Sequence, residues 1–146
     1  MDVDSSADRA VPFRFPHTCT LFLPSVAIAP KICRDFVSGV LDLIGFGHLA
    51  DRAALCTSEL VTNVHRYAGG LVHLQFTAEP TRVRVSVYDS SPKSPTLRQP
   101  AADDQHGRGL GLVGALSDNW GVTDSRLGVP VKAVWFELDT VTAAAV

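Results

Sequence analysis

The chain has 146 residues, of which 46% are hydrophobic, and its formal net charge is −2 at pH 7. This length supports one hydrophobic core, so we expect a single domain over residues 13–140 between short flexible tails at 1–12 and 141–146. The slightly acidic balance gives no general attraction to nucleic acid or anionic lipid, and the chain has neither a bilayer-spanning apolar run nor a secretion signal, which predicts a cytoplasmic protein without direct nucleic-acid or membrane contacts.

The first predicted strand covers residues 18–23 and is stopped by Pro24. A helical pattern follows, in which apolar residues recur at steps of three and four until Gly45 and Gly47 break it. The recurring residues are Ile28, Ile32, Phe36, Val40, Leu43 and Ile44. The pattern begins at Ser25, but Pro30 fits poorly inside a helix; the alternative is that Pro30 lies in the first turn and that the helix starts at about Ala29.

A second helix is predicted from about Leu49 to Ala68, where the pair Gly69-Gly70 ends it. At about 100° per residue, an apolar arc and a polar stripe lie side by side along this helix. The arc consists of Ala53, Leu60, Val61, Val64 and Ala68, and the stripe consists of Glu59, Asn63 and Arg66.

Two segments of alternating polarity, 71–78 and 81–88, predict a β-hairpin joined by the tight Glu79-Pro80 link. Three valines of the second segment share one face, namely Val83, Val85 and Val87. The same alternation places Asp89 on that inward face, where the strand ends.

No periodicity survives from Ser90 to His106, where prolines and polar residues predict a long irregular loop. A third helix is predicted over 109–120, followed by a brief strand at 122–123 and a longer strand over 131–138. The buried side of this helix is predicted to comprise Leu112, Val113, Leu116 and Trp120. The order of elements predicts an α+β fold, a two-layer sandwich in which about three helices cover one face of a mostly antiparallel sheet.

The cysteines are odd in number, lie in apolar segments and have no Cys-x-x-Cys spacing. They are Cys19, Cys33 and Cys56. We predict reduced thiols in the core rather than a disulfide or a metal site.

Glu59 and Asn63 are four residues apart on the second helix, so their side chains can reach a common point about 5–6 Å away. An Asn amide oxygen suits Mg²⁺, which takes its other oxygens from water and substrate phosphates. Glu59 is then placed to orient or deprotonate an attacking hydroxyl or water. An isolated pair of this kind is usually a solvated polar surface, so the hypothesis depends on the other motifs.

Asp89 is a carboxylate on the apolar side of a strand, where an unpaired buried charge is costly. An adenine amino group is one partner for it, because a hydrogen bond to a charged group contributes about 1.5–3 kcal/mol and discriminates against guanine, which presents a carbonyl there. The alternative is an aspartate that caps the turn formed by Ser90-Ser91-Pro92.

The run Gly107-Arg108-Gly109-Leu110-Gly111 offers bare backbone amides at the predicted entry to the third helix. Glycine permits close approach, and a helix N-terminus favours phosphate. The spacing matches neither the P-loop nor the complete dinucleotide motif. Arg108 and Lys132 are candidate cationic donors to the phosphates or, alternatively, solvated surface charges.

In chain order these motifs resemble the GHKL (Bergerat-fold) ATP-binding superfamily. They are S-E-L-V-T-N at 58–63 with Arg66 and Ala68, D-x-S-P at 89–92, G-R-G-L-G-L-V at 107–113 and K-A-V-W-F-E-L at 132–138. The chain is most similar to the histidine-kinase-like ATPase domains of anti-sigma-factor serine kinases of the RsbW and SpoIIAB type. The resemblance covers about 18–138 and implies ATP and Mg²⁺ as cofactors.

Carried over by position, the resemblance makes Asn63 the Mg²⁺ ligand, Glu59 the catalytic base and Asp89 the adenine reader. It assigns further nucleotide contacts to Arg66, Ser91, Gly107, Arg108, Gly109, Leu110, Gly111 and Lys132. The chain departs from the usual N-A-V-[RK]-H-A helix motif at 64–67, so nucleotide binding is implied more firmly than catalysis. The phosphoacceptor histidines of the superfamily lie on a separate helix pair, so we interpret His65 as a helix-surface or packing residue.

The resemblance implies a regulator that binds a transcription factor such as a sigma factor and phosphorylates a Ser or Thr of an antagonist protein, with a homodimer as the implied assembly. The altered run at 64–67 motivates an alternative, a nucleotide-gated protein-binding module without significant turnover in which ATP closes the 90–106 loop. A third hypothesis is an α+β domain that binds no nucleotide.

Overall fold

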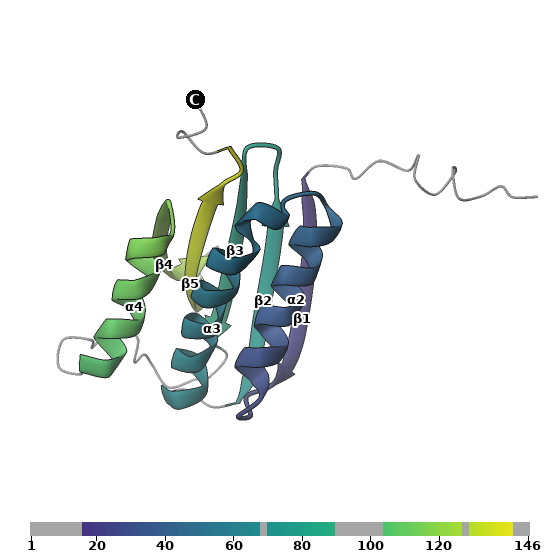
Figure 1. The fold of residues 1–146 in the computed structure, drawn as a ribbon. Coiled ribbons are helices and arrows are strands. Elements are labelled where there is room, and N and C mark those ends of the chain that lie inside the picture. Colours follow the sequence, from purple (N-terminus) through teal and green to yellow (C-terminus); the bar gives the residue numbers. More distant parts are fainter. Residues whose placement is uncertain (1–15, 68–69, 90–103, 127–128, 142–146) are drawn as a thin grey trace, which may run out of the picture.

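The computed structural model describes residues 16–67, 70–89, 104–126 and 129–141. Its elements in chain order are β1 (His17–Pro24), α2 (Ala29–Leu43), the short 3-10 helix η1 (Gly47–Leu49), α3 (Ala50–Tyr67), β2 (Leu71–Ala78), β3 (Arg82–Asp89), α4 (Asp104–Leu116), β4 (Asn119–Arg126) and β5 (Val129–Asp139). The strands form one antiparallel sheet in the order β1-β2-β3-β5-β4. The described helices all lie on one face of this sheet (Figure 1). The predicted α+β sandwich is therefore confirmed.

The core lies between the helices and the inward face of the sheet. Alternation along β2 and β3 points every second side chain inward, and these side chains are buried, as the hairpin pattern predicts. They are Val72, Leu74, Phe76, Ala78, Val83, Val85 and Val87. The largest fully buried side chains are Phe76 on β2 and Phe136 on β5, and each contributes about 1.5–3 kcal/mol by leaving water.

Helix α2 begins at Ala29, the later of the two starts considered, with Pro30 in its first turn, and not at Ser25. The chain turns at Gly45, whose φ is 91°. The face that packs on the sheet lies one residue beyond the row of large apolar residues. It consists of Ala29, Cys33, Val37 and Leu41. Small side chains at the first two of these positions let the helix approach the sheet closely, while Ile28 and Ile32 are exposed.

The predicted bounds of the third helix, 109–120, are wrong. Helix α4 spans Asp104–Leu116. Its last turn is completed by Ser117, which donates from both its amide and its hydroxyl to the carbonyl of Val113, at 2.9 and 2.7 Å. The amide of Asp118 then donates to the carbonyl of Glu137 at 2.9 Å and starts β4. Trp120 therefore lies in a strand of eight residues, where only a brief strand at 122–123 is predicted. The glycine run lies inside the helix, not at its entry.

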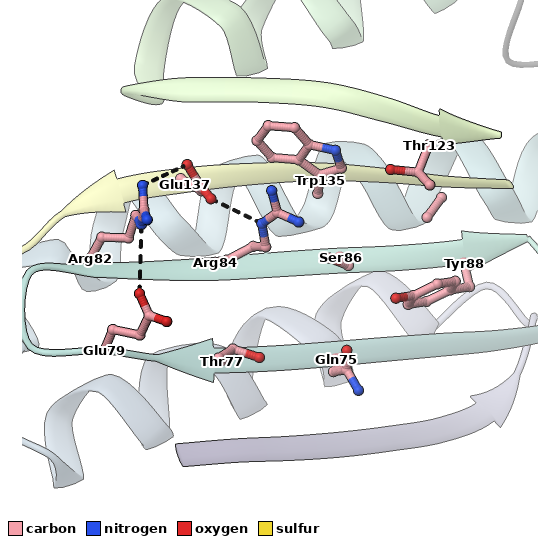
Figure 2. A pocket seen from close by; sticks show the side chains of 11 residues that line it. Gln75, Thr77, Glu79, Arg82, Arg84, Ser86, Tyr88, Thr123, Trp135 and Glu137 are labelled. Atoms are coloured by element: carbon pink, nitrogen blue, oxygen red, sulfur yellow. Dashed lines mark hydrogen bonds and ion pairs between the residues drawn. The ribbon is translucent and has the colours of Figure 1, made fainter. Parts of the chain in front are cut away.

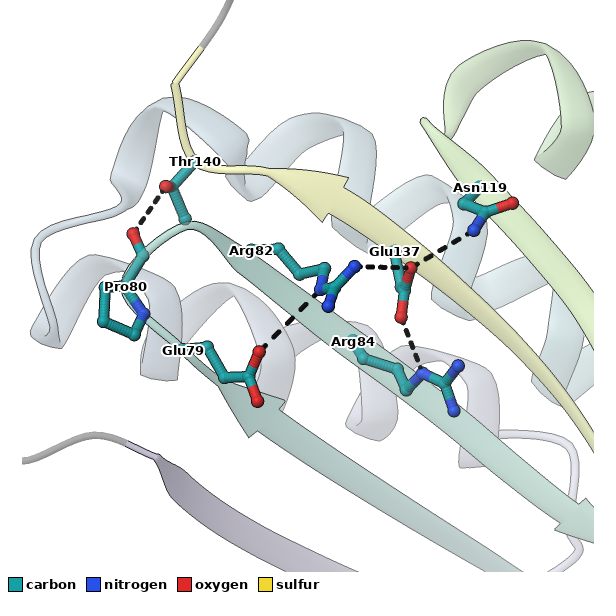
Figure 3. A network of polar contacts seen from close by, with 7 residues as sticks. All are labelled: Glu79, Pro80, Arg82, Arg84, Asn119, Glu137 and Thr140. Atoms are coloured by element: carbon teal, nitrogen blue, oxygen red, sulfur yellow. Dashed lines mark hydrogen bonds and ion pairs between the residues drawn. The ribbon is translucent and has the colours of Figure 1, made fainter.

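The opposite face of the sheet carries a polar network that ties β3, β4 and β5 together (Figure 3). The carboxylate of Glu137 on β5 accepts hydrogen bonds from Nε of Arg84 at 3.0 Å and from Nδ2 of Asn119 at 3.4 Å. A guanidinium nitrogen of Arg82 lies 3.6 Å from the same carboxylate. These cross-strand contacts fix the register in which β3 pairs with β5.

All three cysteines are free thiols, as predicted. Cys33 and Cys56 are buried, and burial raises the pKa of each thiol to about 11, so both stay protonated at neutral pH. Among the described residues, no helix has the length and apolar character needed to cross a bilayer.

Candidate functional site

Two side-chain contacts orient α3 between its neighbouring helices. On one flank, Nη1 of Arg34 from α2 donates to the hydroxyl of Ser58 at 3.2 Å. On the other flank, Nη1 of Arg52 donates to the carbonyl of Leu116, the last residue of α4, at 3.1 Å. One flank of α3 therefore faces α2 and the other faces α4.

The predicted polar stripe lies on the flank that faces α4. Glu59 and Asn63 follow Arg52 by seven and eleven residues, so both lie within about 20° of it around the helix axis. Glu59 is half-buried, and Asn63 is 6% exposed. The structure thus brings the proposed base and the proposed metal ligand to one side of one helix, next to the helix that carries the glycine run.

One atom of the Asn63 side chain is left without a partner among the described residues. Its Nδ2 atom is buried and makes no hydrogen bond there. Leaving a buried amide unpaired costs about 1–3 kcal/mol. A buried polar atom without a partner is rare in folded proteins, so this atom is a candidate to form a hydrogen bond with a bound ligand.

Helices α3 and α4 lie side by side and run in opposite directions (Figure 1). Arg52 in the first turn of α3 reaches the last residue of α4, so the last turns of α3 lie beside the first turns of α4. Gly107, Arg108 and Gly109 belong to this first part of α4. The glycine run therefore lies at the same end of the helix pair as Asn63.

Within the described part of the run, Leu110 packs against the core and Gly111 is exposed. A Cβ atom built on Gly111 meets no atom of the described residues within 4 Å. Packing among the described residues therefore does not require glycine at position 111. A ligand that approaches the backbone closely would require it.

Asp89 is the last residue of β3 and pairs with Val72 on β2 and with Lys132 on β5. It follows Val87 by two positions in an unbroken register, which is the alternation expected from the sequence. Two predicted site residues, Asp89 and Lys132, are thus cross-strand neighbours.

The end of β3 and the end of α3 lie at the same end of the sandwich (Figure 1). Contacts at the opposite end establish this, because Nε2 of His48 in η1 lies 2.9 Å from the carbonyl of Thr140, whose amide donates to Thr81 in the β2–β3 turn. Helix α3 starts at that turn and runs away from it, as β3 does. The C-terminal parts of α3 and β3 and the N-terminal part of α4 therefore converge.

Several predicted site residues are placed only by their backbone or not at all. Ser91 lies outside the described residues, as does most of the predicted 90–106 loop. Arg66 lies in the last turn of α3 and Lys132 in β5, and their side chains are outside the described set, like those of Asp89 and Arg108. His106 is helical and not part of a loop.

A separate hollow of about 510 Å³ lies on the face of the sheet opposite the helices (Figure 2). It is lined by polar and aromatic side chains that point outward from β2, β3 and β5, among them Gln75, Ser86, Tyr88 and Trp135. The guanidinium carbon of Arg84 lies 3.9 Å from the ring centroid of Trp135. The sheet separates this hollow from Asn63, so it is not part of the predicted nucleotide site.

Arg52 is a residue of this region that was not predicted from the sequence. Its position seven residues before Glu59 was the available signal, because that spacing puts both on one stripe. From the sequence alone, an arginine at position 52 is indistinguishable from an ordinary surface charge, because its partner is the carbonyl at the end of α4.

Comparison with known families identifies a histidine kinase-like ATPase domain over residues 31–135. This match covers more than half of the chain and encloses every predicted site residue, from Glu59 to Lys132. A search of curated proteins finds no matching relative. The fold, the stripe on α3 and the family match lead to one conclusion: the chain belongs to the histidine kinase-like ATPase domain family.

Proposed function

We propose that this chain binds ATP with Mg²⁺ where α3, α4 and β3 converge, and that it acts as a regulatory serine/threonine protein kinase of the anti-sigma-factor type. The observation that carries the proposal is the buried Nδ2 atom of Asn63, which has no partner among the described residues, on the flank of α3 that faces α4. Membership of an ATPase domain family supports a nucleotide as the ligand that this amide meets.

Asn63 would hold Mg²⁺ through its amide oxygen. A 180° flip of the amide exchanges its nitrogen and oxygen, so the buried position supplies either a donor or an acceptor. An uncharged oxygen fits a cation that also takes water and phosphate oxygens. When bound, Mg²⁺ would neutralise charge on the phosphates.

Glu59, one turn before Asn63, would take the proton from the attacking Ser or Thr hydroxyl. The hydroxyl oxygen forms a bond to the γ-phosphorus while the bond to the β–γ bridging oxygen breaks, and ADP leaves. Most of the rate would come from positioning and from electrostatic stabilisation of the transferred group, as is usual in phosphoryl transfer.

Asp89 would select adenine by accepting a hydrogen bond from its amino group, and Lys132 lies beside it in the ladder. Further nucleotide contacts would come from Arg66, Ser91, Gly107, Arg108, Gly109, Leu110 and Gly111. If Asp89 reads the base, Asp89→Asn should reduce the preference for ATP over GTP by about tenfold or more, because a hydrogen bond to a charged group is involved.

Calorimetric titration of ATP and GTP, each with and without Mg²⁺, tests the nucleotide site. We expect Mg²⁺-dependent binding of ATP that Asn63→Ala weakens strongly. The matched control is Thr62→Ala, one residue away and about 100° around the same helix. Equal binding by the parent and Asn63→Ala would remove Asn63 from the site.

Transfer of phosphate to a candidate antagonist tests the kinase activity. Proteins that co-purify with the chain in the presence of ATP are the source of such candidates, including sigma factors and their antagonists. Glu59→Gln should abolish transfer while ATP still binds. ATP binding by the parent without transfer to any of these proteins would favour a nucleotide-gated binding module, and light scattering would measure whether a homodimer forms.

A further inference from the structure

We infer that Arg52 is a positioning residue for the nucleotide site, because it holds α4 in register against α3; this inference rests on the proposed function. The side chain does not reach the proposed metal or nucleotide ligands itself. It acts on the opposite end of the helix pair, through the carbonyl of Leu116.

The hydrogen bond from Arg52 gives a partner to a backbone carbonyl at the C-terminus of α4. The last four carbonyls of an α-helix have no partner within the helix and carry partial negative charge. Leu116 is the last residue of α4, and Nη1 of Arg52 donates to its carbonyl at 3.1 Å in a partly buried position. A guanidinium at this place both pairs the carbonyl and interacts favourably with the helix dipole.

Apolar contacts also hold α4 on the core. Of its described side chains, Val113 is buried, while Leu110 and Leu116 are partly buried against the core. Among the side chains that the structure describes on these two helices, which are those of 50–63 and 110–116, the bond from Arg52 joins α3 to α4. This polar link acts together with the apolar contacts in holding α4 along α3.

The register that this link sets aligns the proposed catalytic groups. At a rise of about 1.5 Å per residue, Glu59 lies ~10 Å along α3 from Arg52, and Gly109 lies ~10 Å along α4 from Leu116. Because the helices run in opposite directions, this places Glu59 level with the middle of the glycine run. A shift of α4 by one residue would move the run by ~1.5 Å, which is enough to impair phosphate binding.

Arg34 provides a matched control on the other flank of α3. It is an arginine of α2 that makes a similar interhelical hydrogen bond, to Ser58, but it faces away from α4. Replacing either arginine with methionine removes the donors and keeps an apolar stem. Both variants should lose a similar amount of thermal stability, and only Arg52→Met should affect the nucleotide site.

The experiment measures the melting temperature and the Kd for ATP with Mg²⁺ of the parent, Arg52→Met, Arg52→Lys and Arg34→Met. We expect Arg52→Met to weaken ATP binding by about fivefold to tenfold, less than the loss of a charged hydrogen bond to the ligand itself would cause, because Arg52 acts only through the position of α4. Arg52→Lys, which keeps a donor, should restore binding to within about twofold, and Arg34→Met should bind like the parent.

Hydrogen exchange of α4 amides without nucleotide gives a second readout, and exchange should be faster in Arg52→Met than in Arg34→Met. Parent-like ATP binding by Arg52→Met would overturn the positioning role alone. An equal loss of affinity in both methionine variants would reduce the effect to general stability and also overturn it. Absence of ATP binding by the parent would overturn the proposed function and, with it, this inference.

Discussion

Gly111→Ala separates a requirement for folding from a requirement for ligand binding. Glycine in a helix interior is about 0.8–1.0 kcal/mol less favourable than alanine. A Cβ at position 111 meets no atom of the described part of the chain within 4 Å, so the new methyl group creates no clash there. The variant should therefore be stabilised by about 1 kcal/mol, which raises the melting temperature of a chain of this size by about 2–4 °C.

The same substitution should weaken ATP binding if the glycine run lies against phosphates. A methyl group prevents the close approach of a phosphate to the backbone that glycine permits. Gly39→Ala is the control, because Gly39 is an exposed glycine of α2 with equally open surroundings. It should give the same stabilisation with unchanged affinity for ATP.

Thermal unfolding and ATP titration of Gly111→Ala and Gly39→Ala show whether Gly111 contributes to nucleotide binding. If Gly111→Ala were both more stable and equal to the parent in ATP affinity, Gly111 would have no part in nucleotide binding. If Gly111→Ala were less stable than the parent, α4 would not be the regular helix described above.

Three further expectations concern packing and charge. Gly121→Ala should destabilise the fold by about 1–3 kcal/mol in urea titrations, because a Cβ there lies 2.6 Å from Cζ2 of Trp135; a neutral effect would contradict this packing. Burial raises the pKa of Cys33 and Cys56 to about 11, above the ordinary value of 9.0, so their contribution to stability is complete below pH 9 and is lost as the pH rises from 9 to 11. A variant with alanine at both positions should show a flatter decline over that range, and parallel curves would argue against buried thiols. Glu137→Gln should cost only about 1 kcal/mol or less, since its arginine partners are 41% and 49% exposed, and the difference from the parent should shrink at high salt; an equal cost at low and high salt would assign the loss to packing.

The elements with a strong local pattern were predictable from the sequence. Alternation along 71–78 and 81–88 fixed both the hairpin and the face that it buries, and Pro30 indicated the start of α2 at Ala29 as one of two alternatives. The buried face of α2 was harder, because its small residues Ala29 and Cys33 carry less signal than the exposed isoleucines beside them.

The region of α4 and β4 was not predictable at the same level. Glycine lowers helix propensity throughout 107–114, and this outweighed the local start signal that two aspartates at 103–104 offer. The end of α4 depends on the hydrogen bond from Asp118 to Glu137, which lies on a strand later in the chain. Strand β4 gains its stability from pairing with β5, a tertiary effect that overrides weak local preference.

In the candidate site, too, local features were predictable from the sequence and tertiary contacts were not. The stripe of Glu59 and Asn63 follows from helical spacing alone. Its proximity to α4 depends on a contact between Arg52 and Leu116, which are 64 residues apart in the chain. The unpartnered Nδ2 atom of Asn63 likewise becomes visible only when the surrounding side chains are in place.

The two tryptophans of the chain lie on opposite faces of the sheet. Trp120 pairs with the inward residue Phe136, and its indole nitrogen lies 3.0 Å from the position of a Cβ on Gly114, so it packs against α4. Trp135 lies on the outer face, over Gly121. Replacing Trp135 with phenylalanine would leave a single indole next to α4, whose intrinsic fluorescence would report movements of that helix without any attached dye.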